Sequence, residues 1–222
     1  MKNTISLSAG LLWVLVWVGF MFLYTFLDVA IWQKFFPAGR KYFNIISIAL
    51  CSAGYLFLLV KKSNCDIRLF ENISGQGILL ALSCALLFYF VLDLFLDPLL
   101  ARCFPSSEEK YHEALIQLSR TPIITLLQIC IFAPILEETL IRGFLLDGLS
   151  AGYGKTTALF ISSILFALLH FNMVQTLSAL ICGFVLGLLY LKTGSLFCCI
   201  LAHIGYNLLA YITTILPLCA KK

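Results

Sequence analysis

Long apolar runs separated by short polar stretches dominate the pattern along this chain. The runs cover residues 11–32, 43–60, 77–100, 122–147, 156–171, 174–191 and 195–218. A helix that crosses a bilayer needs about 20 predominantly apolar residues, so the pattern predicts about seven transmembrane helices, the fifth of them short. The longest polar stretch, residues 102–121, predicts a loop or a helix at the membrane surface. The expected fold class is all-α, a polytopic membrane helix bundle.

The composition supports this class and narrows the partners. Hydrophobic residues make up 61% of the chain and charged residues 12%, whereas a soluble domain carries about 25% charged residues. We therefore expect a multi-pass integral membrane protein, embedded in the lipid bilayer of the cell (inner) membrane. The net charge of +4 is spread over loops without a basic cluster, so no nucleic-acid partner is expected. Positive residues are divided almost evenly between the two sides, which leaves the orientation open.

The motifs that could carry chemistry are confined to the second half of the chain, and this suggests two parts. Residues 1–120 are predicted to form N-terminal transmembrane helices and a connecting loop, and they contain no motif. Residues 121–222 are predicted to form a catalytic core of four helices.

Three smaller patterns bear on how the helices fit together. Asp93 and Asp97 are one turn apart near the end of an apolar run, and we interpret them as a hydrated helix end. Gly183 and Gly187 have the spacing that lets two membrane helices approach closely. Pro134 has no amide proton, so it frees a backbone carbonyl one turn earlier in its helix.

Three charged residues stand within six positions of one apolar run, at Glu137, Glu138 and Arg142. Each charge at the membrane centre costs about 2.5–3.5 kcal/mol even on the more lenient insertion scale. Glu138 and Arg142 are four residues apart and can form an ion pair on one helix face. Glu137 lies about 100° around the helix, so the same arginine cannot easily serve it. A buried carboxylate without a cation is a candidate for proton chemistry.

Two histidines and an asparagine lie at a similar depth in later apolar runs. His170 ends the fifth run, and His203 and Asn207 are one turn apart in the last. A rise of about 1.5 Å per residue brings all three near the level of Glu137. Glu137 and His170 could hold and deprotonate a water, and the other two could donate to an oxyanion. No serine or cysteine is paired with a base, so direct attack of water on an amide bond is favoured.

These residues form three motifs in chain order: EExxxR at 137–142, FxxxH at 166–170 and HxxxN at 203–207. In this order on successive membrane helices, the motifs resemble those of the CPBP family of intramembrane proteases. That family includes the type II CAAX prenyl endopeptidases and the Abi proteins linked with bacteriocin processing. The known family architecture has eight membrane segments, one more than the apolar pattern predicts here.

The resemblance implies an intramembrane, glutamate-dependent endopeptidase that uses no cofactor and no catalytic metal. Its substrate would be a membrane-anchored peptide or protein, prenylated or not. The motif positions imply specific roles: water activation by Glu137 and His170, an oxyanion site formed by His203 and Asn207, and support of the geometry by Glu138, Arg142 and Phe166.

Three alternatives stay open at this stage. Glu137, His170 and His203 could supply the three protein ligands of a catalytic zinc. A proton-coupled transporter could use the same polar group as a relay, although the two halves show no inverted repeat. A non-catalytic immunity or scaffold protein could keep the polar core for packing alone.

Overall fold

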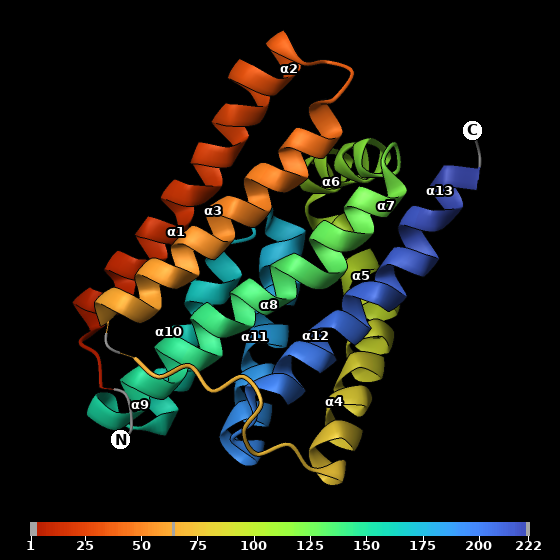
Figure 1. The fold of residues 1–222 in the computed structure, drawn as a ribbon. Helices are drawn as coiled ribbons and strands as arrows, with labels where there is room; N and C mark the ends of the chain where they lie inside the picture. Colours follow the sequence, from red (N-terminus) through yellow and green to blue (C-terminus); the bar gives the residue numbers. More distant parts are fainter. Residues whose placement is uncertain (1–3, 64, 221–222) are drawn as a thin grey trace.

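The computed structural model describes residues 4–63 and 65–220, and every regular element in them is helical (Figure 1). Six helices in this part of the chain are long and apolar enough to cross a membrane. They are Leu7–Phe35, Arg40–Ser63, Gly75–Cys103, Pro122–Tyr153, Met173–Thr193 and Leu196–Cys219. Each contains or closely matches one predicted apolar run. The prediction of an all-α, polytopic membrane bundle is therefore confirmed, and the protein is a multi-pass integral membrane protein.

The predicted fifth span differs from the others. It forms α10 (Lys155–Leu168), a helix of 14 residues and thus about 21 Å long, shorter than the hydrocarbon core of about 30 Å. The helix stops early because the chain turns at Phe171, whose φ of +50° is left-handed. Asn172 then caps the next helix by accepting from the amides of Val174 and Gln175. The fold thus has six long helices and one shorter apolar helix.

Several long helices alternate between α-helical and π-helical (η) segments. The first three comprise α1 (Leu7–Leu27), η1 (Asp28–Trp32) and α2 (Gln33–Phe35); α3 (Arg40–Ser63); and α4 (Gly75–Phe88), η2 (Tyr89–Leu96) and α5 (Asp97–Cys103). After the separate helix α6 (Pro105–Leu118) come α7 (Pro122–Thr125), η3 (Leu126–Phe132), α8 (Ala133–Glu138), η4 (Thr139–Leu146) and α9 (Asp147–Tyr153). The chain continues through α10, α11 (Met173–Thr193), α12 (Leu196–Ala210), η5 (Tyr211–Ile215) and α13 (Leu216–Ala220).

Prolines account for three of these π segments. Each of these prolines, Pro98, Pro134 and Pro217, follows the residue that caps the end of a π segment. The backbone amide of that capping residue donates to the carbonyl five positions earlier. A proline cannot donate, and its ring crowds the carbonyl four residues earlier. The helix therefore widens its turn just before the proline. These wide turns leave backbone carbonyls without a helical donor.

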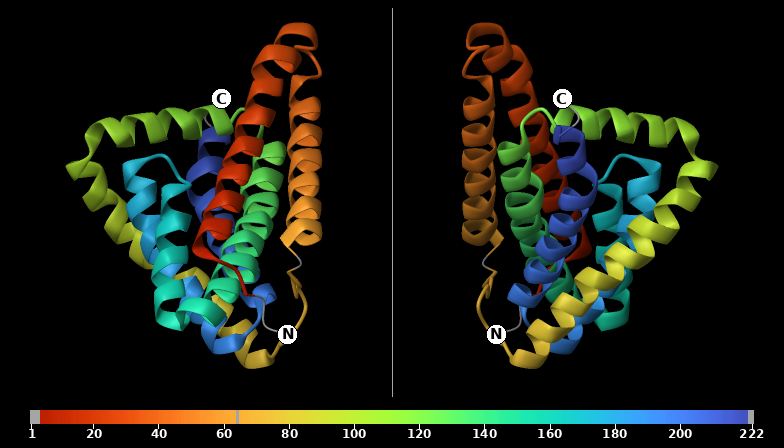
Figure 2. Two further views of the ribbon diagram at one scale, coloured as in Figure 1. Left: turned by 90° about the vertical axis from the view of Figure 1, so that its left-hand side faces the viewer. Right: turned by 90° about the vertical axis from the view of Figure 1, so that its right-hand side faces the viewer.

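The N-terminal helices pack on the outside of the bundle. α1 and α3 form an antiparallel pair (Figure 1), joined near the connecting turn by an ion pair of 2.6 Å between Arg40 and Asp28. Trp13 of α1 contacts Tyr55 of α3 and Phe144 of η4 with edge-on rings, which attaches the pair to the bundle. α6 lies across one end of the bundle, roughly perpendicular to the long helices (Figure 2). It therefore takes the surface position expected for residues 102–121.

Glycines allow the closest helix contacts. A Cβ added at Gly183 would lie 3.0 Å from the Phe166 ring, and one at Gly187 would collide with Leu159. The close approach predicted from the spacing of these glycines is thus confirmed between α10 and α11. Gly205 of α12 similarly faces Ala85 of α4. The first 120 residues therefore contribute α4 to the packing of α12, and the division at residue 120 stays a prediction.

Candidate active site

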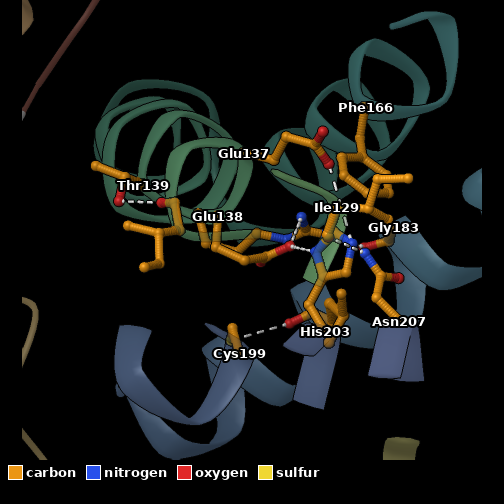
Figure 3. Close-up of polar contacts among 12 residues, drawn as sticks. Ile129, Glu137, Glu138, Thr139, Phe166, Gly183, Cys199, His203 and Asn207 are labelled. Carbon is orange, nitrogen blue, oxygen red and sulfur yellow. Dashed lines mark hydrogen bonds and ion pairs between the residues drawn. The ribbon is translucent and has the colours of Figure 1, made fainter. Parts of the chain in front are cut away.

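The EExxxR motif places its two carboxylates in different environments. α8 ends at Glu138, which is fully buried, whereas the Glu137 side chain keeps 21% of its exposure. The two side chains leave the helix about 100° apart, and both approach His203 from different directions (Figure 3). Of the two side chains, only that of Glu137 is partly accessible.

Glu138 and Arg142 form the ion pair expected from their spacing. The Arg142 Nη1–Glu138 Oε1 distance is 2.7 Å, and both side chains are fully buried. Arg142 also donates from Nη2 to the Gly183 carbonyl at 2.9 Å, and its guanidinium lies 4.6 Å from the centre of the Phe166 ring. Within the described residues, Glu138 Oε2 and Arg142 Nε have no hydrogen-bond partner. The pair ties α10 and α11 to the acidic helix.

His203 lies between the two carboxylates. It projects from α12, and its Nδ1 is 2.9 Å from Glu138 Oε1, while its Nε2 is 4.0 Å from Glu137 Oε2. A carboxylate oxygen only accepts, so Nδ1 carries the proton. This contact fixes the ring and directs Nε2 toward Glu137. The sequence had placed His203 at the right depth but had not paired it with Glu138.

Asn207 lies one turn beyond His203 on the same helix (Figure 3). Its Nδ2 donates to the Ile129 carbonyl of η3 at 2.9 Å. The Cys130 thiol donates in turn to the Asn207 carbonyl at 3.5 Å. α12 and η3 are therefore joined in both directions beside the acidic pair, and the second amide proton of Asn207 is left for another acceptor.

His170 is held in the turn that follows α10. Its Nδ1 is 3.0 Å from the Phe166 carbonyl, and because a carbonyl only accepts, Nδ1 is the donor and neutral His170 presents Nε2 as an acceptor. The Phe166 ring contacts both imidazoles edge-on, at 5.1 Å from His170 and 5.8 Å from His203. In the described part of the chain, His170 makes no hydrogen bond or ion pair with Glu137. The structure thus brings His203, and not His170, closest to that carboxylate.

The Phe166 ring thus contacts Arg142, His170 and His203, and both imidazoles donate from Nδ1. A water about 2.8 Å from both Glu137 Oε2 and His203 Nε2 fits the 4.0 Å separation of these atoms. Over residues 4–63 and 65–220, no three His, Cys, Asp or Glu side chains converge as metal ligands. The zinc set of Glu137, His170 and His203 is not assembled in this arrangement. The geometry suits the handling of protons between carboxylate and imidazole.

Two polar contacts near the site were not expected from the sequence. Tyr206, between His203 and Asn207 on α12, donates to Asp93 at 2.6 Å. Ser178 of α11 donates to Asp97. The interpretation of the two aspartates as a hydrated helix end was incomplete, because they are half-buried and join η2 and α5 to neighbouring helices. Their one-turn spacing was the only signal in the sequence, and it does not identify the partners.

Fold and site together define a polytopic membrane protein with a buried carboxylate–histidine centre. Residues 119–209 match the model of a protein family described as type II CAAX prenyl endopeptidase Rce1-like. This segment contains all three motifs, and the match confirms the resemblance inferred from the sequence. The match supports a CAAX-type intramembrane protease at the family level. No match was found among curated proteins or among solved structures.

Proposed function

We propose that this protein is a glutamate-dependent intramembrane endopeptidase. It hydrolyses peptide bonds of membrane-anchored or lipidated substrates in the cell (inner) membrane with a water activated by Glu137 and His170, without a resident metal. The observation that carries the proposal is the contrast within the acidic pair. Glu138 is buried and bonded to a guanidinium and an imidazole, whereas Glu137 is partly accessible and, within the described residues, pairs only with His203 Nε2 at 4.0 Å.

The proposed reaction begins when Glu137 removes a proton from the water and the oxygen attacks the scissile carbonyl carbon. His170 shares that proton, because its bond to the Phe166 carbonyl leaves Nε2 as the acceptor. The proton then passes to the leaving nitrogen as the C–N bond breaks, giving a carboxylic acid and an amine and restoring the Glu137 carboxylate. No oxidant, reductant or further reactant is needed.

His203 and Asn207 receive the oxyanion in this scheme. His203 donates from Nδ1 to Glu138 at 2.9 Å. A second proton on Nε2 would let that atom donate to the oxyanion as well. Asn207 contributes its second amide proton from the same side of α12. Donors fixed before the reaction are the most effective oxyanion stabilisers.

Cleavage by the purified protein tests the proposal. Quenched fluorescent peptides would be presented in detergent in three forms: prenylated near the carboxyl end, the same without the prenyl group, and one anchored by an apolar helix. We expect the wild type to cleave at least one form and Glu137→Gln to lose about 10²–10⁴-fold in rate. The matched control is Glu113→Gln, an exposed glutamate of α6, which should cleave like the wild type.

Each other outcome points elsewhere. Unchanged cleavage by Glu137→Gln would remove the glutamate from the mechanism. Substrate-driven proton flux in liposomes without cleavage would indicate a transporter, and neither activity would indicate a scaffold. One zinc per chain by elemental analysis, lost with activity on chelation and regained with it, would replace the metal-free mechanism by a zinc-dependent one.

A further inference from the structure

The Ile129 carbonyl connects Pro134 with the Asn207 side chain: Pro134 cannot donate to it, and Asn207 does. In η3 the amide of Ala133 donates to Gln128, five residues back. In that register the next amide, at position 134, would donate to the Ile129 carbonyl, but a proline has none. The Nδ2 of Asn207 occupies the vacant place at 2.9 Å. The amide must present its nitrogen here, because its oxygen would face another acceptor.

We infer that Pro134 is a positioning residue for Asn207, an inference that rests on the proposed function. By withholding an amide proton, Pro134 keeps the Ile129 carbonyl open for one N–H of the Asn207 side chain. That bond fixes the plane of the amide and so the direction of the second N–H. A side-chain amide with two rotatable bonds would otherwise sample several orientations, and oxyanion donors work only when they are held in place.

Pro134 differs from the other two prolines that follow π segments. Pro98 and Pro217 have the same register before them, with the amides of Asp97 and Leu216 donating five residues back. By the same count they free the carbonyls of Asp93 and Ile212. In the residues that the structure describes, neither carbonyl accepts a side-chain hydrogen bond. A wide turn before a proline is thus a general consequence of the sequence, whereas capture of the freed carbonyl occurs beside the acidic pair.

The surrounding contacts leave Asn207 little freedom to find another partner. The Cys130 thiol, next to Ile129, bonds the Asn207 carbonyl at 3.5 Å, so the backbone of α12 is held at the same level of η3. Pro134 itself is buried and lies one turn before Glu138. The same proline therefore links the turn that carries the acidic pair to the orientation of the amide opposite.

Pro134→Ala tests the inference because it restores the missing amide proton while favouring the helix. Alanine is a far better helix former than proline, so a purely structural role predicts unchanged or improved activity. We expect kcat to fall by about 10–100-fold with KM unchanged, since the donor acts mainly in the transition state. The thermal midpoint should stay within a few degrees of the wild type. Pro217→Ala, at an exposed position of α13, is the matched control and should keep wild-type kcat.

A double variant separates positioning from a general effect on the site. Pro134→Ala combined with Asn207→Ala should be no slower than Asn207→Ala alone, because the proline acts through that amide. Multiplicative losses, or wild-type kcat in Pro134→Ala, would overturn the inference.

A measurement without substrate covers the case in which the wild type cleaves nothing, which would refute the proposed function. With ¹⁵N-labelled asparagine, the Asn207 side-chain amide protons should give two well-separated signals, assigned from their loss in Asn207→Ala. Pro134→Ala should shift them toward the values of a solvated amide, and Pro217→Ala should not. Unchanged signals in Pro134→Ala would overturn the positioning role whatever the activity.

Discussion

The protein holds two pairs of carboxylates in its membrane helices, and their surroundings differ in kind. In the Glu137–Glu138 pair, Glu138 is fully buried and contacts a guanidinium at 2.7 Å and an imidazole at 2.9 Å. In the Asp93–Asp97 pair, both side chains are half-buried and accept from uncharged hydroxyls on neighbouring helices. One pair is held by charge and the other by neutral hydrogen bonds.

This difference separates chemistry from packing. Charged side chains inside a membrane bundle usually pair with one another, and in the described part of the chain the Arg142 guanidinium bonds Glu138. Glu137 is left at the edge of that ion pair with partial access. Asp93 and Asp97 each accept a hydrogen bond from a hydroxyl group and lie toward the end of their helix. These bonds join helices, and both carboxylates take part in them. We therefore expect substitutions in the two pairs to affect different properties.

The largest effect should come from Glu138→Gln. The amide keeps the volume but strands Arg142 and His203 in the core, and removing one partner of a buried ion pair costs about 3–5 kcal/mol. Thermal unfolding in detergent should show a large drop in the midpoint. Glu137→Gln should leave that midpoint nearly unchanged, because its side chain is partly exposed, while it removes cleavage. Equal losses of stability in the two variants would contradict the division between them.

The sequence predicts well how deep a residue lies in the membrane. It predicts poorly in which direction the side chain leaves its helix, and the site shows both. Apolar runs predict where helices begin and end, because burial in lipid requires them. The contact between Glu138 and Arg142 followed from their four-residue spacing within one helix. The contact between His203 and Glu138 crosses 65 residues. It depends on how α12 is rotated about its axis, which packing against α4 and η3 decides.

Proline and glycine patterns were the best local signals. Pro134 correctly predicted a freed carbonyl, but not that the carbonyl of Ile129 would meet Asn207. Gly183 and Gly187 correctly predicted a close helix contact. The fifth run was predicted to be short and to end at residue 171, whereas α10 ends at Leu168, just before the left-handed turn at Phe171. Tertiary contacts lie close to this turn. Asn172, which donates to the Ser107 carbonyl of α6, is one of them.

The next largest effect is expected on kcat, from substitutions of the residues around Glu137. Losing one oxyanion donor typically costs about 10²–10³ in kcat, so Asn207→Ala should lose about that factor with KM nearly unchanged. Asn207→Asp should be no better, since a carboxylate would repel the developing charge. His170→Ala should be slower still, because it removes the acceptor that shares the water proton. A rise in KM with intact kcat for Asn207→Ala would make it a ground-state contact instead.

The smallest effect is expected from breaking the hydrogen bond to Asp93. It tests most directly whether the two carboxylate pairs differ in role. Tyr206→Phe removes the hydroxyl that bonds Asp93 and keeps the edge-on ring contact with Phe88 at 5.6 Å. Hydrogen bonds between membrane helices average about 0.6 kcal/mol, with a maximum near 1.7. In a double-mutant cycle with Asp93→Ala, unfolding free energies should show a coupling of about this size. Because Tyr206 bonds η2 and Asn207 bonds η3, kcat should change by less than about threefold. A fall in kcat as large as that of Asn207→Ala would place the aspartates within the catalytic arrangement and end the distinction between the two pairs.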